Sequence, residues 1–391
     1  MFHQVTDSAV APCVTRDDLG AFLHHMVRLD ASDLFMTVGA QPSVKVEGRV
    51  MPVGTERLAP GAVKHYAYTV MTEHQIRDFE RDLECDLAIT VEGLGRFRFN
   101  MYVQRGQVSM VVRHVRSTIP SMAELRLPPM VERLSMLRQG LVLVVGSAGA
   151  GKSTTLAAML EHRNQHAPGH ILTVEDPIEY LHAHGRCIVD QREVGLDTRS
   201  FGDALRHALR EAPDVIMIGE IRDQETMQHA LHYAETGHLC VSTLHANNAN
   251  QAIERVINFF PDTARRQILM DLSLNLKGVV AQRLVQGVAG RRVPATEIML
   301  LSSYISELIQ KGEVDDLKSV IAKSGEVGMH SFDQSLFELY QRGEISLEQA
   351  LEHADSKTDL SLRVRLSAGV TPEAPPNLAQ LRKRRTAAGQ G

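Results

Sequence analysis

One eight-residue segment, Gly146-Ser-Ala-Gly-Ala-Gly-Lys-Ser153, constrains the fold of this chain more than any other part of the sequence. It matches the pattern G-x-x-x-x-G-K-[ST] at every position, and it lies between the apolar run 141–145 and a segment with helical periodicity. The glycines let backbone N–H groups turn inward around an anion, and the following helix adds the positive end of its dipole. The segment therefore predicts a strand, a phosphate-binding loop and a helix in an α/β domain.

The residue types of this loop predict a role for each position. We expect Lys152 to reach the β- and γ-phosphates of ATP and Ser153 to ligate Mg²⁺. A glycine-rich turn that contains a lysine by chance is the alternative, and the complete match between a strand and a helix disfavours it. The candidate ATP-binding residues are Gly146, Ser147, Ala148, Gly149, Ala150, Gly151, Lys152, Ser153 and Thr154.

Composition and charge disfavour several other classes of protein. Lys and Arg number 42 against 47 Asp and Glu, a formal net charge of −5, so we expect no nucleic-acid partner. The sequence shows neither a targeting signal at its start nor an apolar run of membrane-spanning length. We therefore expect a cytoplasmic protein that meets a membrane only through partners. The four scattered cysteines predict neither a zinc knuckle nor a disulfide framework: Cys13, Cys85, Cys187 and Cys240.

The pattern of apolar residues changes along the chain and predicts several domains. Residues 1–116 combine helical and alternating segments, which predicts an α/β domain with an antiparallel sheet, and residues 117–122 are the expected linker. In residues 123–292 solid apolar runs alternate with helical segments, as in a parallel sheet covered by helices. We expect a small helical region at 293–368 and a disordered tail at 369–391.

Polar residues that follow the apolar runs are the candidates for catalysis, because the carboxyl ends of parallel strands meet at one edge of a sheet. Glu220 follows the run 215–218 and is our candidate for the carboxylate that orients or deprotonates a water molecule; a helix cap is its alternative. A metal-ordering Asp would be usual before it, where this chain has Gly219. We therefore expect outer-shell support for Mg²⁺ from another acidic segment: Glu175, Asp176 and Glu179.

Two histidines flank the apolar run 239–243. His238 precedes this run and His245 follows it. A histidine at a strand end can bond a γ-phosphate or can be an ordinary polar residue, and the sequence alone leaves both readings open. A metal site at His182, His184 and Cys187 is disfavoured, because closely spaced His and Cys in a loop are more often uncoordinated.

Several motifs, in their order along the chain, closely resemble the type II/IV secretion ATPase superfamily. The phosphate loop and the segments 174–179, 204–214, 219–223 and 237–245 carry this resemblance, and the Walker A, Asp box, Walker B and His box of the superfamily appear in order among them. The N-terminal segments Asp33-Leu-Phe-Met-Thr-Val-Gly39 and Gly95-Arg-Phe-Arg-Phe-Asn100 are similar to the PilT/PilU family of type IV pilus retraction ATPases. The resemblance thus covers most of the chain except its tail.

The resemblance implies a fold, an assembly and a place in the cell. It implies a hexameric ring in which ATP lies between a PAS-like N-terminal domain and a RecA-like domain. It also implies that ATP hydrolysis, with Lys152 and Glu220 at its centre, powers pilus retraction and twitching motility at the inner-membrane pilus base, through a platform protein. Arginines in the matching N-terminal segment are candidate arginine fingers, with charged strand edges as the equal alternative: Arg96, Arg98 and Arg113.

The branch of the family follows from what the chain has and lacks. It lacks the extra N-terminal domain and the four-cysteine zinc site usual in assembly ATPases, which favours retraction. Segments 243–250 and 258–261 resemble the PilU branch more than the PilT branch, and Tyr304-Ile-Ser-Glu-Leu-Ile-Gln310 lacks both arginines of the comparable PilT element. We therefore expect a retraction motor that works together with a sister ATPase. The alternatives are a nucleotide-binding accessory ring component with little turnover and an assembly-type ATPase of pili or type II secretion.

Overall fold

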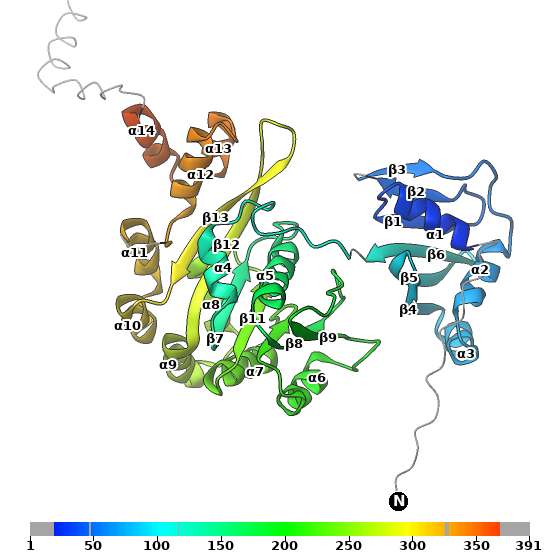
Figure 1. Ribbon diagram of the computed structural model, residues 1–391, viewed down its shortest axis with the longest axis horizontal. Helices are drawn as coiled ribbons and strands as arrows, with labels where there is room; N and C mark the ends of the chain where they lie inside the picture. The colour runs from blue at the N-terminus through cyan, green and yellow to red at the C-terminus, as the bar shows by residue number, and fades with distance from the viewer. Residues whose placement is uncertain (1–18, 47, 116, 325–327, 368–391) are drawn as a thin grey trace, which may run out of the picture. The chain divides into compact units, whose positions relative to one another are not determined.

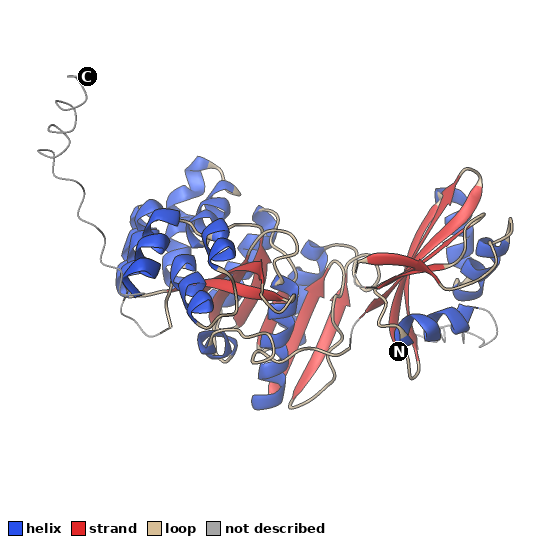
Figure 2. Cartoon of the chain, turned by 90° about the horizontal axis from the view of Figure 1, so that it is seen from above, coloured by secondary structure: helices blue, strands red, loops and turns tan. Residues whose placement is uncertain are grey.

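The computed structural model describes residues 19–46, 48–115, 117–324 and 328–367, and it divides into two compact units (Figure 1). The first unit comprises Met1–Ile119, Val174–His184 and Val189–Ala204; the second comprises Pro120–Thr173, Gly185–Ile188 and Leu205–Gly391. Both units consist of strands packed against helices (Figure 2). The predicted α/β fold class is confirmed. The predicted tail, 369–391, and Cys13 lie outside the described residues.

The first unit contains a six-stranded antiparallel sheet in the order β3-β2-β1-β6-β5-β4. Its β5–β6 hairpin turns at Arg105 and Gly106, whose φ angles of 50° and 72° suit a tight two-residue turn that matches the strand twist. The strands are β1 (Asp33–Thr37), β2 (Ser43–Val46), β3 (Arg49–Pro52), β4 (Glu84–Val91), β5 (Gly95–Gln104) and β6 (Gln107–Val115). The helices are α1 (Leu19–Arg28), α2 (Ala62–Val70) and α3 (Glu73–Asp82).

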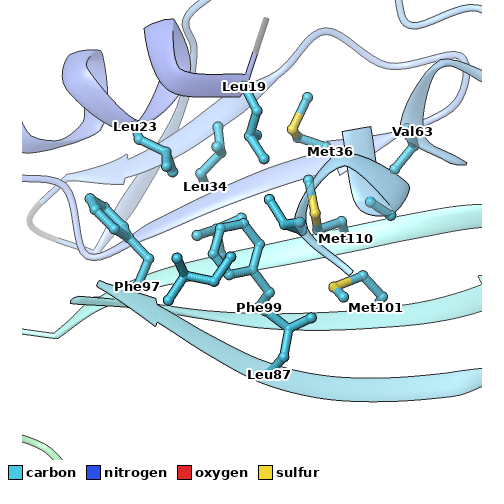
Figure 3. Packing of buried hydrophobic residues seen from close by; sticks show 14 of the residues in the cluster. Leu19, Leu23, Leu34, Met36, Val63, Leu87, Phe97, Phe99, Met101 and Met110 are labelled. Carbon is cyan, nitrogen blue, oxygen red and sulfur yellow. The ribbon is translucent and has the colours of Figure 1, made fainter. Parts of the chain in front are cut away.

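Alternation along β5 gives this unit its core. Phe97, Phe99 and Met101 are buried, because every second side chain of a strand points to the same face of the sheet. Figure 3 shows them packed with residues from α1, β1, α2, β4 and β6: Leu19, Leu23, Leu34, Met36, Val63, Leu87 and Met110. The residues between them on β5, including Arg96 and Arg98, therefore belong to the other face.

A seven-stranded sheet in the order β13-β12-β7-β11-β10-β8-β9 forms the centre of the rest of the chain. Strands β7, β11 and β10 are buried at every position, as expected for parallel strands covered on both faces. The strands are β7 (Gly140–Val145), β8 (Gly169–Glu175), β9 (Cys187–Glu193), β10 (Val215–Ile218), β11 (Leu239–Leu244), β12 (Leu276–Gln286) and β13 (Arg292–Leu300). The division between the two units passes through β8 and β9.

Helices alternate with these strands along the sequence. The α-helices are α4 (Pro129–Ser135), α5 (Lys152–His166), α6 (Phe201–Ala208), α7 (Gln224–Glu235), α8 (Ala249–Asn258) and α9 (Arg265–Asn275). Short 3₁₀ helices follow α6 and α8: η1 (Leu209–Glu211) and η2 (Asp262–Ala264). No helix among the described residues is both long and apolar enough to cross a bilayer.

The C-terminal helical region begins later than the sequence predicts. Residues 292–300 form strand β13, which pairs antiparallel with β12, so the expected helical start at 293 is wrong. The reason is that β12 ends at a turn around Gly290, and the chain then returns along the edge of the sheet. The helices after it are α10 (Ser303–Lys311), η3 (Val314–Asp316), α11 (Leu317–Lys323), α12 (Phe332–Gln341), α13 (Leu347–His353) and α14 (Lys357–Ser367).

Candidate functional site

The phosphate loop lies between β7 and α5, where the sequence predicts it. Gly149 and Gly151 have φ angles of 75° and 89°, in the left-handed region that side chains disfavour. A Cβ atom on Gly146 would lie 2.6 Å from the backbone oxygen of Gln282 on β12. These positions therefore require glycine, two because of their backbone angles and one because of a neighbouring strand.

Lys152, the first residue of α5, folds back over the loop. Its Nζ atom donates hydrogen bonds to the carbonyl oxygens of Gly146, at 3.0 Å, and of Ser147, at 2.9 Å. Burial lowers the pKa of its ammonium group, and the negative charge of Glu220 acts in the opposite direction. The side chain is only 9% exposed, so its positive charge is held close to the loop. The next residue, Ser153, is exposed.

Gln282, on β12, supports the phosphate loop. It is 3% exposed, and its Oε1 atom accepts a hydrogen bond of 2.7 Å from the hydroxyl of Thr155 on α5. Its Nε2 atom lies 2.8 Å from the position that a Cβ atom on Gly151 would take. One side chain of β12 thus contacts both the loop and the first turn of the helix. The sequence analysis missed this residue, because Gln282 lies far along the chain and belongs to none of the motifs.

Glu220 lies just beyond the carboxyl end of β10 and has two nitrogen-bearing neighbours, His245 and Arg222. Its Oε1 atom is 3.1 Å from Nε2 of His245, and its Oε2 atom accepts a hydrogen bond of 2.8 Å from Nε of Arg222. The turn before it is fixed to β11, since Thr243 donates a 2.7 Å bond to the carbonyl of Gly219. The structure therefore brings Glu220 and His245 together at the same edge of the sheet as Lys152.

Two of the cavities among the described residues border the phosphate loop. The first, of about 670 Å³, is lined by the outer part of the loop, by the segment after β11 and by one face of α8: Gly146, Ser147, Ala148, His245, Ala246, Asn247, Gln251, Glu254, Arg255, Asn258 and Phe259. The second, of about 600 Å³, has lining residues that include Gly151, Thr154, Gln282, Leu284, Arg291 and Arg292. A triphosphate on the loop would have room on both sides, with the mixed apolar and basic walls of the second cavity available to a nucleoside.

The candidate residues of the acidic segment belong to the first unit. Glu175 is 6% exposed, and its Oε1 atom accepts a 3.2 Å hydrogen bond from Nε2 of Gln191. Asp176 and Glu179 are exposed. Both side chains reach solvent, whereas Glu175 is enclosed by protein.

Each candidate arginine finger is close to a buried carboxylate of the first unit. Nε of Arg98 lies 3.1 Å from Oε1 of Glu193, and Nη2 of Arg96 lies 4.0 Å from Oε2 of the same residue. Burial raises the pKa of Glu193, which is 1% exposed, and Arg98 partly offsets that effect. Nε of Arg113 lies 2.8 Å from Oδ1 of Asp33. The sequence analysis missed both carboxylates, because only the tertiary fold shows what they contact.

His238 is a correction to the predicted site. It precedes β11 at the amino end of the strand, where its backbone oxygen accepts a hydrogen bond from N–H of Gly140 at the start of β7. The phosphate loop follows β7 at the opposite end, one strand length away, or roughly 20 Å at 3.3 Å per residue. In parallel strands, therefore, only the histidine after the strand, His245, can lie beside the loop.

The candidate metal ligands of the loop before β9 bind protein groups. Nδ1 of His184 accepts a hydrogen bond of 3.1 Å from N–H of Val189, and Sγ of Cys187 lies 3.0 Å from the carbonyl oxygen of Ala167. Within the described ranges, no group of three or more His, Cys, Asp or Glu side chains converges as a metal site.

Comparison with known proteins gives matches over most of the chain. A profile of the family described as "Type II/IV secretion system protein" matches residues 19–338. The chain is 52% identical over 347 residues to the type IV pilus ATPase PilU of Pseudomonas aeruginosa, covering 88% of this chain and 91% of PilU. It is 41% identical over 337 residues to the retraction ATPase PilT of the same organism, covering 86% and 98%. The crystal structure of the pilus retraction motor PilT with bound ADP superposes with a TM-score of 0.82 at 40% identity, covering 88% and 99%.

The contact between Gln282 and Thr155 leads to a double-mutant prediction. Gln282→Leu leaves the buried hydroxyl of Thr155 without its acceptor, so we expect the free energy of unfolding to fall by about 1–3 kcal/mol. We also expect weaker binding of a fluorescent ATP analogue, because the loop loses its support. Urea denaturation and equilibrium titration measure the two effects.

The matched control is the double variant Gln282→Leu with Thr155→Val, which removes both partners and should recover much of the lost stability. If the free energy of unfolding lost in the double variant equals the sum of the losses in the two single variants, the two side chains are not coupled.

Proposed function

This chain belongs to the type II/IV secretion system protein family, and from that premise we propose that it is an ATPase that powers type IV pilus retraction. The observation that carries the proposal is the arrangement of Lys152, Glu220 and His245 around the phosphate loop at one edge of a parallel sheet. PilT and PilU, the relatives at 41% and 52% identity, are named as pilus ATPases. Hydrolysis of ATP at this loop is the chemistry that the arrangement supports best.

The loop would bind the phosphates through its backbone. Its N–H groups and the N-terminus of α5 favour negative charge, and Lys152 can exchange its two carbonyl acceptors for phosphate oxygens. The exposed Ser153 hydroxyl fits a Mg²⁺ ion, which would offset the charge of the phosphates. The cavity lined by Gly151 and Leu284 would hold the nucleoside.

Glu220 would prepare the attacking water. Its carboxylate is positioned from two sides by Arg222 and His245, so its direction is fixed before ATP binds. Arg222 can balance the charge of the carboxylate, while His245, which also lines the larger cavity beside the loop, can bond a γ-phosphate oxygen. Glu220 therefore acts as the general base and His245 as the group that reports an intact triphosphate.

Arg96, Arg98 and Arg113 are our candidates for arginine fingers. In the present conformation they lie beside Glu193 and Asp33, so an arginine that stabilises the transition state must leave its carboxylate for a phosphate. A carboxylate and a phosphate are both anions, and a guanidinium group can bind either one in the same planar geometry. Such an exchange would couple the state of the nucleotide to a change of conformation.

We place the enzyme in the cytoplasm at the inner-membrane base of the pilus, as a homohexamer that acts on a platform protein together with a sister retraction ATPase. This extends the family membership and the similarity to PilU and PilT to an assembly. Light scattering of the purified protein with a non-hydrolysable ATP analogue should give six times the mass of one chain. A monomer at every protein and nucleotide concentration would rule out the ring.

Two substitutions separate binding from hydrolysis. We expect Lys152→Ala to lose binding of labelled MgATP, because the phosphates lose their cation. Glu220→Gln should bind ATP as the wild type does but release phosphate more slowly, by about 10²–10⁴-fold, since the amide cannot accept the proton of the attacking water.

The controls for these two variants are Lys311→Ala and Glu348→Gln, which change exposed residues of α10 and α13. Equal rates for Glu220→Gln and the wild type would remove Glu220 from catalysis. Absence of turnover in the wild type would instead favour an accessory, nucleotide-binding ring component.

A genetic test addresses the direction of the motor. Cells that lack the gene, and cells that carry only the Glu220→Gln allele, should lose twitching motility while surface pili stay normal or become more numerous. Electron microscopy of pili and a surface-spreading assay measure the two traits. Loss of surface pili would support an assembly ATPase, and normal twitching with the Glu220→Gln allele would show that hydrolysis by this chain is dispensable.

A further inference from the structure

A buried carboxyl group at the start of α8 has no part in the site described above. Glu297 lies on β13 and is 1% exposed. Its Oε1 atom accepts a hydrogen bond of 2.9 Å from the backbone N–H of Ala249, the first residue of α8. The N-terminus of α8 is thus attached to the edge strand of the sheet by an acidic side chain without access to water.

The start of α8 determines where His245 lies. Only three residues separate His245 from α8, and Asn248 caps the helix by accepting a 2.9 Å hydrogen bond from N–H of Gln251. The side chain of Gln251 in turn accepts a 3.1 Å bond from N–H of Asn247. Because β11 fixes one end of this short segment and α8 the other, a displacement of the helix start would move His245 away from Glu220.

The same helix forms one wall of the cavity beside the phosphate loop. Gln251, Glu254, Arg255 and Asn258 line that cavity together with the outer part of the loop. Glu297 itself lines neither of these two cavities, and its hydrogen bond to Ala249 connects it to the helix that forms one wall of the first.

Charged groups from three other elements surround Glu297. Arg283 of β12 and Lys318 of α11 favour its ionised form, and Asp355, between α13 and α14, opposes it. Asp355 itself lies 2.8 Å from Nη1 of Arg283 and 2.9 Å from Nζ of Lys318. Burial is the largest influence and raises the pKa of Glu297 to about 7, although the bond from Ala249 lowers it. The carboxyl group therefore changes its charge near neutral pH.

We infer that Glu297 is a positioning residue of the ATPase reaction: through the N-terminus of α8 it holds His245 and the cavity wall in place. The inference rests on the proposed function, since it concerns the same site. An ionised carboxylate stabilises the N-terminus of a helix through the helix dipole, and a protonated one does so less. The C-terminal helical region, which contains Lys318 and Asp355, is thereby linked to the cavity beside the phosphate loop.

The test compares the wild type with Glu297→Gln, which keeps an oxygen acceptor for Ala249 but cannot ionise. We expect kcat of the variant to be lower by roughly fivefold at pH 8, where the wild-type carboxylate is charged, and to approach the wild-type value at pH 6. The dissociation constant for ATP should stay within about twofold, because α8 does not carry the phosphate loop. His330 contacts β13 as well, with Nε2 2.9 Å from Oγ1 of Thr296, and burial lowers its pKa.

Two further variants guard against a general loss of stability. Ile298→Val removes one buried methylene from the neighbouring position of β13 and should leave the ratio of kcat to wild type independent of pH. Asn248→Ala removes the cap of α8 without touching Glu297 and should lower kcat by roughly fivefold at every pH. A pH-independent ratio for Glu297→Gln, or full activity of Asn248→Ala, would overturn the inference.

Hydrogen exchange gives a readout that does not depend on turnover. In Glu297→Gln the amides of residues 245–252 should exchange faster than in the wild type above pH 7, after correction for intrinsic rates. Unchanged exchange would refute the positioning role. A wild type without ATPase activity would refute the proposed function, while the exchange experiment would still decide whether Glu297 fixes the start of α8.

Discussion

The parallel register of β7, β11 and β10 is the constraint on which the candidate site depends. Val145, the last residue of β7, lies opposite Leu244, the last residue of β11, and Ile218, the last residue of β10, lies opposite Ser242, so the three strands end within two residues of one another. The residues that follow β7, β11 and β10 are, in that order, the phosphate loop, His245 and the turn that carries Glu220. Slippage of one strand would reverse the direction of its side chains and separate the base from the loop. The hydrogen bonds from β11 to the turn after β10 reinforce this alignment.

Three buried ionisable side chains lie around these parallel strands. Lys152, Glu193 and Glu297 are all at most 9% exposed and have polar partners: Lys152 within its own loop, and the two glutamates on segments distant in the sequence. Burying an ionised group is costly unless it is paired, so these contacts fix where the segments meet. Nucleotide binding or a change of protonation would alter these same contacts, so they are suited to regulating the ATPase reaction.

Sequence patterns predicted most of the fold and part of the site. The solid apolar runs identified β7, β8, β10 and β11, and the loop motif identified the start of α5. The family membership expected from the motifs is confirmed by the family profile. The prediction was wrong at β13, which was expected to be helical, and at His238, which lies at the amino end of its strand. Both errors concern direction in space, because a linear pattern does not state where a chain returns or which end of a strand meets a loop.

By itself, the sequence determined the local elements of this protein. The glycines at 149 and 151 permit the backbone angles of the loop, and the apolar runs make the strands that flank it, since these properties depend on neighbours in the chain. Only the tertiary structure decided which distant residues complete the site. Gln282 reaches the loop because β12 pairs with β7, and Glu297 reaches α8 from β13, which pairs with β12. Such contacts depend on the closing of long loops rather than on any local pattern.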